Sequence, residues 1–208
     1  MAFTLGVMRR LRSISINFWH DGAEYFDKCM KTNGLLSVKV SGKWIKHKFK
    51  CSEDYIKNVC YGSCCTGSNR VLISLLPNEV IRQEQLGFAV EGGKLQASTV
   101  TGKCPHLHLN GLCRLHFTSD KPFGCIASPF TFNSAGTLIL RNRYNMMKCH
   151  GSGDYAYRVF RASLDIIFGY DEAQRICDYY DSNDGDLEAF ISRANFEKIK
   201  YLDSLKSK

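Results

Sequence analysis

The residues best suited to chemistry are the cysteines, which gather in the middle of the chain. Eight of the ten lie between residues 51 and 149. Ten cysteines in 208 residues stay below the roughly 8–10% typical of short secreted disulfide scaffolds. The sequence therefore predicts thiolates that hold a metal ion or an iron–sulfur cluster. The two outlying cysteines, Cys29 and Cys177, are interpreted as ordinary thiols without a ligand role.

The spacing of these cysteines argues against one simple zinc site. Structural zinc sites usually contain two C-x2-C turns, whereas the nearest equivalent here is Cys60-x3-Cys64, followed at once by Cys65. Consecutive side chains of an extended backbone point in different directions, so Cys64 and Cys65 are poorly placed to grip one ion in the same way. Two centres, or one polynuclear cluster, fit better than a mononuclear zinc. We favour an iron–sulfur cluster, such as a 4Fe-4S cluster, with zinc as the alternative.

The predicted ligands come from most of the cysteine block. They are Cys60, Cys64, Cys65, Cys104, Cys113, Cys125 and Cys149, with the participation of Cys51 left open. Four histidines lie beside these cysteines and could complete a coordination shell or move protons. They are His106, His108, His116 and His150.

Residues around Cys149 are candidates for binding an anionic substrate. His150 precedes Gly151-Ser152-Gly153, a turn before a predicted helix whose free amides suit a phosphate or carboxylate. A simple helix cap is the alternative. Arg141 and Arg143 could contact a base and a phosphate, and a solvated strand edge explains them equally well. No P-loop, G-x-G-x-x-G or nucleophile elbow occurs, so no catalytic residue is assigned and enzymatic activity stays an open question.

Composition is that of an ordinary globular domain with an excess of positive charge. The chain has 44% hydrophobic and 23% charged residues and a formal net charge of +8. That charge favours an anionic partner, nucleic acid or a nucleotide, with a protein substrate as the alternative. No apolar run approaches the roughly 18 residues that span a bilayer, and the N-terminus lacks the order of a secretory signal. We expect a cytoplasmic protein whose cysteines stay reduced; the oligomeric state is not predicted.

The elements around the cysteines predict an α+β fold. A short helix is expected within residues 1–33, then a β-hairpin whose strands, 35–40 and 43–49, flank a turn at Ser41-Gly42. A buried strand over 71–76 leads into a helix that starts at Pro77 and stops at Gly87. Further strands are expected at 94–100 and 137–143.

Beyond Cys149 the pattern becomes helical. Ser152 is expected to cap a helix that ends at Gly169, Asp171 to cap a second, and Asp184 or Asp186 to start a third that buries Leu187, Phe190 and Ile191. The predicted organisation is one domain. It comprises an N-terminal helix and hairpin (1–48), a small irregular cysteine-cluster core (49–150) and a helical tail packed on that core (151–208).

The order of motifs resembles the YkgJ-like cysteine-cluster family over about residues 49–150. The resemblance rests on Cys60-Tyr-Gly-Ser-Cys64-Cys65, Pro77-Asn-Glu-Val, Cys104-Pro-His-Leu, Cys113-Arg-Leu and Lys121-Pro-Phe-Gly-Cys125-Ile-Ala-Ser-Pro129. The family pattern C-x-x-C-G-x-C-C differs here, because eight residues separate Cys51 from Cys60 and Tyr61 precedes Gly62. Arginines of the family's R-P-x-x-C-R pattern are replaced by Lys121 and Ile126.

What the resemblance implies is a chain that chelates zinc or iron. A similar arrangement in flagellin lysine methylases, where an iron–sulfur centre is linked to methyl transfer, implies redox or group-transfer chemistry on nucleic acid or protein as one reading. Two rivals remain: a non-catalytic zinc module that organises a contact surface, and a metal carrier.

Overall fold

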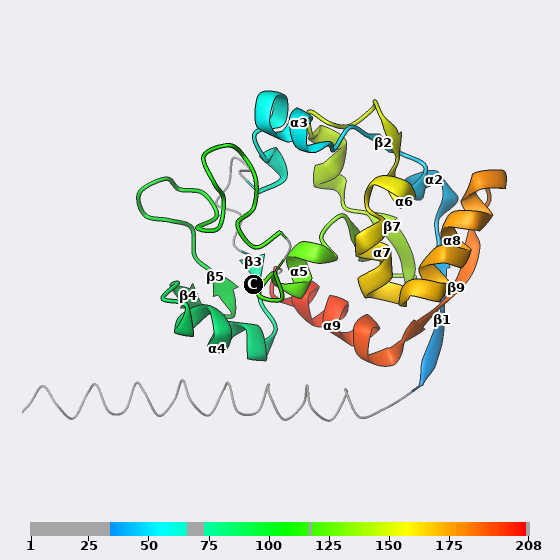
Figure 1. The fold of residues 1–208 in the computed structure, drawn as a ribbon. Helices are drawn as coiled ribbons and strands as arrows, with labels where there is room; N and C mark the ends of the chain where they lie inside the picture. Colours follow the sequence, from blue (N-terminus) through cyan, green and yellow to red (C-terminus); the bar gives the residue numbers. More distant parts are fainter. Residues whose placement is uncertain (1–33, 66–72, 117, 207–208) are drawn as a thin grey trace, which may run out of the picture.

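The fold is α+β, as predicted, with a four-stranded sheet at its centre. The computed structural model describes residues 34–65, 73–116 and 118–206, so the helix expected within residues 1–33 and Cys29 lie outside the described part. The sheet has the order β6-β7-β1-β9, with β1 parallel to β7 and antiparallel to β9. Its strands are β1 (Leu35–Val40), β6 (Phe130–Phe132), β7 (Thr137–Leu140) and β9 (Leu187–Ser192). In Figure 1 this sheet and the helices α7 and α8 form the right-hand half of the molecule.

Residues Leu187–Ser192, predicted to lie in a third C-terminal helix, form strand β9 instead. Residues Leu187–Ser192 pair with all of β1, from Leu35 opposite Ser192 to Val40 opposite Leu187. The side chains of Leu187, Ala189 and Ile191 are buried while those between them are exposed, which is the two-residue period of a strand with one buried face. The predicted helix is wrong over these six residues, and α9 (Arg193–Ser204) starts only after them.

The predicted hairpin is also wrong. Only β1 forms as expected, because residues 42–45 form a helical turn, α2 (Gly42–Ile45). The Ser41 carbonyl oxygen accepts hydrogen bonds from the N–H groups of Trp44 and Ile45 at 3.1 and 3.0 Å, and burial of Ile45 to 2% exposure favours this turn. The second strand is reduced to β2 (Lys48–Phe49), which pairs with β8 (Asp154–Tyr155).

The helix predicted from Pro77 is confirmed, and the strand before it is shorter than predicted. Of the strand expected over 71–76, residues 71–72 lie outside the described part, and β3 (Ile73–Ser74) stops before α4 (Pro77–Gln85). Gly87 follows the helix with φ +82°. A small sheet of order β3-β5-β4 contains β4 (Val90–Glu91) and β5 (Lys94–Leu95). The strand expected to reach Val100 stops at Leu95, and the N–H of Ser98 bonds to the Lys103 carbonyl (2.8 Å) to close a loop. This sheet and α4 occupy the lower left of Figure 1.

Helices follow Cys149 along the chain, as the sequence predicts. The predicted helix from Ser152 to Gly169 is two helices, α6 (Ala156–Val159) and α7 (Arg161–Phe168). They are separated at Phe160, whose φ and ψ are −107° and 32°. Gly169 ends α7 as expected. The predicted second helix is α8 (Tyr170–Ser182), but its N-cap is Gly169, so the predicted cap Asp171 lies within its first turn.

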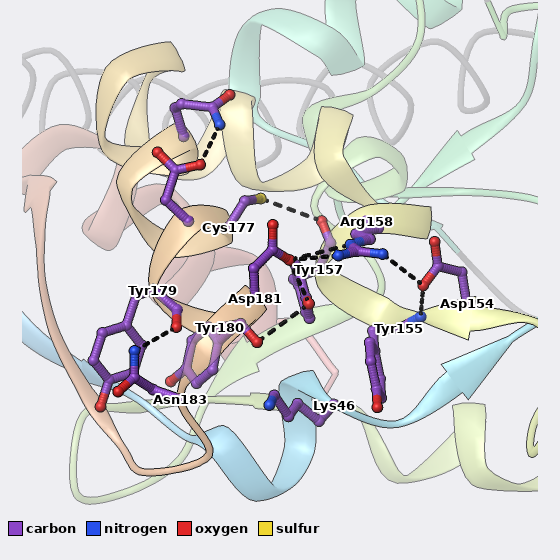
Figure 2. A network of polar contacts seen from close by, with 12 residues as sticks. Lys46, Asp154, Tyr155, Tyr157, Arg158, Cys177, Tyr179, Tyr180, Asp181 and Asn183 are labelled. Atoms are coloured by element: carbon purple, nitrogen blue, oxygen red, sulfur yellow. Dashed lines mark hydrogen bonds and ion pairs between the residues drawn. The ribbon is translucent and has the colours of Figure 1, made fainter.

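A polar network fastens α6 to α8 (Figure 2). The hydroxyl of Tyr157 and the guanidinium of Arg158 both donate to Asp181 Oδ1, each at 2.7 Å. The thiol of Cys177 is buried and lies 3.7 Å from the Tyr157 carbonyl oxygen. Cys177 thus lies in the packed core, where α6 and α8 meet.

Candidate metal centre

All eight cysteines of the central block are described, and all are free thiols. Irregular segments carry most of them. Cys51 precedes α3 (Glu53–Tyr55), Cys60 ends a π-helical turn (Ile56–Cys60), and Cys64 and Cys65 belong to a 3-10 turn (Ser63–Cys65). Cys104 and Cys113 lie in the loop after β5, Cys125 lies in α5 (Phe123–Ile126), and Cys149 lies in the loop before β8.

Four of these thiols form a first group of neighbours. Cys51 is exposed at the surface, but partial desolvation, with contributions from the nearby thiols of Cys64, Cys149 and Cys60, raises its pKa to about 12. Burial also raises the pKa of Cys149 to about 11, again with contributions from Cys60 and Cys64. We call Cys51, Cys60, Cys64 and Cys149 the first thiol set. Cys51, which the spacing alone left open, is thus a neighbour of three predicted ligands.

Direct contacts join the chain segments of this set. The N–H of Lys50, next to Cys51, donates to the Cys149 carbonyl at 2.9 Å. The hydroxyl of Tyr55 donates to the carbonyl of Lys148 at 2.9 Å, and Ser63 Oγ lies 3.6 Å from the sulfur of Met147. Residues 147–149 are therefore held against both the Cys51 and the Cys64 segments.

The other four thiols form a second group. Burial raises the pKa of Cys125, with further contributions from Cys104 and Cys113. Burial likewise raises the pKa of Cys104, which also responds to Cys113. For Cys65, a hydrogen bond with Cys64 raises the pKa most, followed by burial and the thiols of Cys64, Cys125 and Cys104. We call Cys65, Cys104, Cys113 and Cys125 the second thiol set.

A close approach of two glycines brings the loop of the second set onto the turn that carries Cys65. Gly62 and Gly111 have φ values of +64° and +84°. A Cβ atom on Gly111 would lie 2.6 Å from the Tyr61 backbone, and one on Gly62 would lie 2.3 Å from the Gly111 carbonyl oxygen. Only glycine fits at such a contact.

Gln83 of α4 links the same loop to the segment before α5. Its Oε1 lies 2.7 Å from Nε2 of His106, and its Nε2 donates to the Asp120 carbonyl at 3.3 Å. Within the loop, Leu107 and Cys113 form an isolated β-bridge. These contacts set the path of the backbone on which Cys104, Cys113 and Cys125 lie.

Cys64 and Cys65 mark the boundary between the two sets. Their sulfur atoms are 3.9 Å apart. The hydrogen bond between the two thiols lowers the pKa of Cys64, and the positive charges of Arg143 and Lys121 lower it further. Because a metal ligand must be a thiolate, the two cations favour the form of Cys64 that binds metal. Lys121, noted in the sequence as the replacement for an arginine of the R-P-x-x-C-R pattern, is not among the site residues predicted from the sequence.

The thiols are neighbours without a closed coordination shell. Among the described residues, no group of three or more histidine, cysteine, aspartate or glutamate side chains is arranged so that it could hold a metal ion. The donor set itself, eight thiols and no disulfide, suits zinc or an iron–sulfur cluster.

The four candidate histidines have different surroundings. His106 is 3% exposed, contacts Gln83 and stacks edge-on with Phe88 at a centroid distance of 4.3 Å. His108 is exposed, and the ring of His116 lies 3.1 Å from Lys121 Nζ. His150 lies at the edge of the first thiol set, with its Nε2 2.8 Å from Nδ1 of His47.

The two candidate arginines are held by protein groups. Arg141 donates to Asp203 Oδ1 at 2.7 Å, and the pair is largely buried. Arg143 donates to Ser128 Oγ and lies over the ring of Tyr144, 5.2 Å from its centroid. Residues Asn142–Met146 form a 3-10 helix, so the predicted strand ends at Leu140. The structure thus places Arg143, and not Arg141, among the groups that act on Cys64.

A cavity of about 550 Å³ lies elsewhere, on the β1 and β9 side of the sheet. Its lining includes Ser37, Lys39, Asp186, Glu188 and Phe196. None of the described cysteines borders it, so the cavity and the thiol sets are separate features.

Within the described part of the chain, no helix combines the length and the apolar character needed to cross a membrane. No family model, no curated protein and no solved structure matches this chain. The resemblance to the YkgJ-like family therefore stays a prediction.

Proposed function

We propose that this protein binds an iron–sulfur cluster through the cysteines of its central block. The observation that supports the proposal is the presence of eight free thiols in segments up to 98 positions apart, together with the backbone contacts that hold some of these segments against one another. Four thiolates are the usual ligand set of a 4Fe-4S cluster. The excess of cysteine and the lack of C-x2-C turns favour this cofactor over zinc, which also takes four thiolates. In its enzymatic form, the proposal assigns the cluster a redox or group-transfer role.

The decisive experiment is metal and acid-labile sulfide analysis of the chain purified without oxygen. The proposal expects iron and sulfide with broad visible absorbance. Cys125→Ser should lower the iron content, whereas Cys177→Ser, a matched loss of a buried thiol outside both sets, should leave it unchanged. A colourless zinc protein would replace the proposal with the zinc module, and a centre that passes readily to an apo acceptor would favour the metal carrier. A chain without metal contradicts all three.

A second candidate function, binding of single-stranded nucleic acid, is favoured by a basic strip beside the first thiol set. The strip consists of Lys43, Lys46, Lys48 and Lys50. Lys48 lies over the ring of Tyr155 and Lys50 over that of Tyr55, each 5.3 Å from the ring centroid. Lys46 is paired with Asp184, whereas no acidic partner is found for the other three lysines among the described residues.

Lysines that alternate with aromatic rings can contact phosphates while bases stack nearby. The strip ends at Lys50, which directly precedes Cys51, so a bound strand would run towards the first thiol set. On this proposal, the nucleic-acid contact would adjoin the proposed cluster.

The test is fluorescence anisotropy with a labelled single-stranded oligonucleotide at several salt concentrations. Lys48→Gln with Lys50→Gln should weaken binding about tenfold at low salt and reduce the salt slope by about 2. Lys39→Gln with Lys200→Gln removes the same charge on the β1 and α9 side and should have little effect. Equal losses in both double variants would indicate non-specific attraction to net charge, and no binding by the wild-type chain rules out this candidate.

A further inference from the structure

Strand β9 forms one edge of the central sheet, since β1 is its only neighbouring strand in the described part of the chain. The N–H of Arg193 donates to the Gly34 carbonyl oxygen at 2.9 Å. Because the direction of main-chain groups alternates along an antiparallel strand, those of Ile191 and Ala189 also face β1. The N–H and C=O groups of Glu188 and Phe190 therefore point away from the sheet.

Two charged side chains of α8, Glu172 and Arg175, bind this outer edge. Helix α8 runs beside β9 (Figure 1), and Glu172 Oε1 accepts a hydrogen bond from the Phe190 N–H at 2.7 Å. Arg175 Nη2 donates to the Glu188 carbonyl oxygen at 2.6 Å. The two side chains also bind each other, Nε to Oε2 at 2.8 Å and Nη2 to Oε1 at 2.6 Å. One ion pair thus satisfies both a donor and an acceptor of the edge.

This ion pair makes the same two hydrogen bonds as one residue of a parallel strand placed next to β9. In a parallel ladder, a residue opposite Ala189 would donate its N–H to the Glu188 C=O and accept the Phe190 N–H at its own C=O. Arg175 supplies the donor and Glu172 the acceptor. Hydrogen bonds to charged groups are stronger than those between neutral groups, so an incoming peptide strand would replace strong bonds with weaker ones.

We propose that the Glu172–Arg175 pair prevents the chain from associating with a second copy of itself through the outer edge of β9. Unpaired edge groups are a template for strand addition, and two identical edges can pair across a two-fold axis. The side chain of Phe190, 47% exposed, and that of Leu35, 71% exposed, would add apolar surface to such a contact. They lie on the same face of the sheet, because Phe190 is opposite Ser37 and Leu35 is two positions from Ser37. This inference goes beyond the proposed function and does not depend on metal binding.

Sedimentation velocity over a range of protein concentrations tests the proposal. Glu172→Ala with Arg175→Ala frees both edge groups, and self-association should become at least about tenfold tighter than in the wild type. Glu53→Ala with Lys57→Ala also removes one ion pair within a short stretch of chain without changing the net charge, and it should behave as the wild type does. An association constant of the first double variant that equals the wild-type value would overturn the proposal.

Phe190→Pro, added to that double variant, identifies the surface that associates. Proline is tolerated in an edge strand where the N–H points outward, and it removes the donor that a second copy would bind. The triple variant should return to the wild-type state. Association that persists undiminished in the triple variant would place the contact elsewhere and contradict the proposal.

Hydrogen exchange at the Phe190 amide gives a measurement on single positions. In the wild type this amide should be protected at every concentration, whereas in the double variant it should exchange fast when dilute and become protected as the concentration rises. Val38, paired with Ala189 inside the β1–β9 ladder, reports folding and should stay protected throughout. If Val38 loses protection, Arg175→Gln is the smaller change, since it frees only the Glu188 carbonyl, and it should still strengthen self-association; no strengthening there contradicts the proposal.

Discussion

The carboxylate of Glu79 accepts a hydrogen bond from the backbone N–H of Phe123 at 2.6 Å, across 44 positions of sequence. Its other oxygen accepts from the N–H of Leu76 at 2.8 Å, at the start of the same helix, α4, to which Glu79 belongs. Burial raises the pKa of Glu79, while these two N–H groups and Lys198 oppose the rise. One side chain thereby joins the start of α4 to the start of α5, two residues before Cys125.

Glu79→Gln should destabilise the protein by about 1–3 kcal/mol, because an amide leaves one of the two partly buried N–H groups without an acceptor. Urea unfolding measures the loss. Glu84→Gln, an exposed change in the same helix, should stay within about 0.5 kcal/mol. Equal effects of the two substitutions would show that Glu79 does not join the helices in this way.

Gly111→Ala should lower the free energy of unfolding more than Gly102→Ala does. Both glycines have positive φ, +84° and +64°, so both alanines face a backbone strain of about 1–2 kcal/mol. Only at Gly111 would the new Cβ also meet backbone, that of Tyr61 at 2.6 Å, while Gly102 has open space. Thermal unfolding should show the larger loss for Gly111→Ala, by at least about 1–2 kcal/mol over the control. A loss no greater than that of Gly102→Ala contradicts the close approach.

Asp203→Asn should lower the free energy of unfolding and change how that free energy depends on pH. Asp203 accepts from Arg141 at 2.7 Å and from the Thr131 hydroxyl at 2.5 Å. Burial raises the pKa of Asp203, but Arg141, Thr131 and Lys206 together bring it below its ordinary value. We expect a loss of about 1–3 kcal/mol at neutral pH, since a largely buried guanidinium would lose its partner and the pair keeps some solvent screening.

The sign of the pH effect follows from that lowered pKa. The ionised form stabilises the fold above the unfolded-state pKa of about 3.9, and this stabilisation is lost as the pH falls through the lower folded-state value. Wild-type stability should therefore drop more steeply than that of Asp203→Asn below about pH 4. Asp184→Asn, whose parent side chain is 90% exposed, is the control and should keep the wild-type slope.

His47 should make the protein less stable in mild acid. Burial lowers the pKa of His47, and the charges of His150 and Lys43 lower it further. Below about pH 6.5 the unfolded chain therefore binds more protons than the folded one, and stability falls until the pH passes the lower folded-state pKa. His47→Gln should reduce the difference in urea midpoint between pH 7.5 and pH 5.5.

The loss should be partial, because burial also lowers the pKa of His106 and His116. His108→Gln, at an exposed position, is the matched control and should leave the pH dependence as it is in the wild type. A variant at His47 that keeps the full wild-type dependence would refute the role assigned to its burial.

Local patterns in the sequence determined the elements whose causes are local. Pro77 and Gly87 bound a helix because proline suits a first helical turn and glycine a left-handed stop, and the alternation in residues 35–40 predicts a strand from its own side chains. The concentration of cysteines between residues 51 and 149 likewise indicates thiolate chemistry without any knowledge of the fold.

Only the tertiary structure decided what depends on partners far along the chain. Residues 187–192 form a strand because β1, some 150 positions earlier, offers them a full ladder of hydrogen bonds, and this outweighs the helical pattern that surrounds them. The partner of Arg141 is Asp203, 62 positions away, and no sequence motif predicts this pairing. The approach of remote cysteine segments has the same origin, since backbone contacts such as the hydrogen bond from the Lys50 N–H to the Cys149 carbonyl oxygen bring together parts of the chain that no local pattern connects.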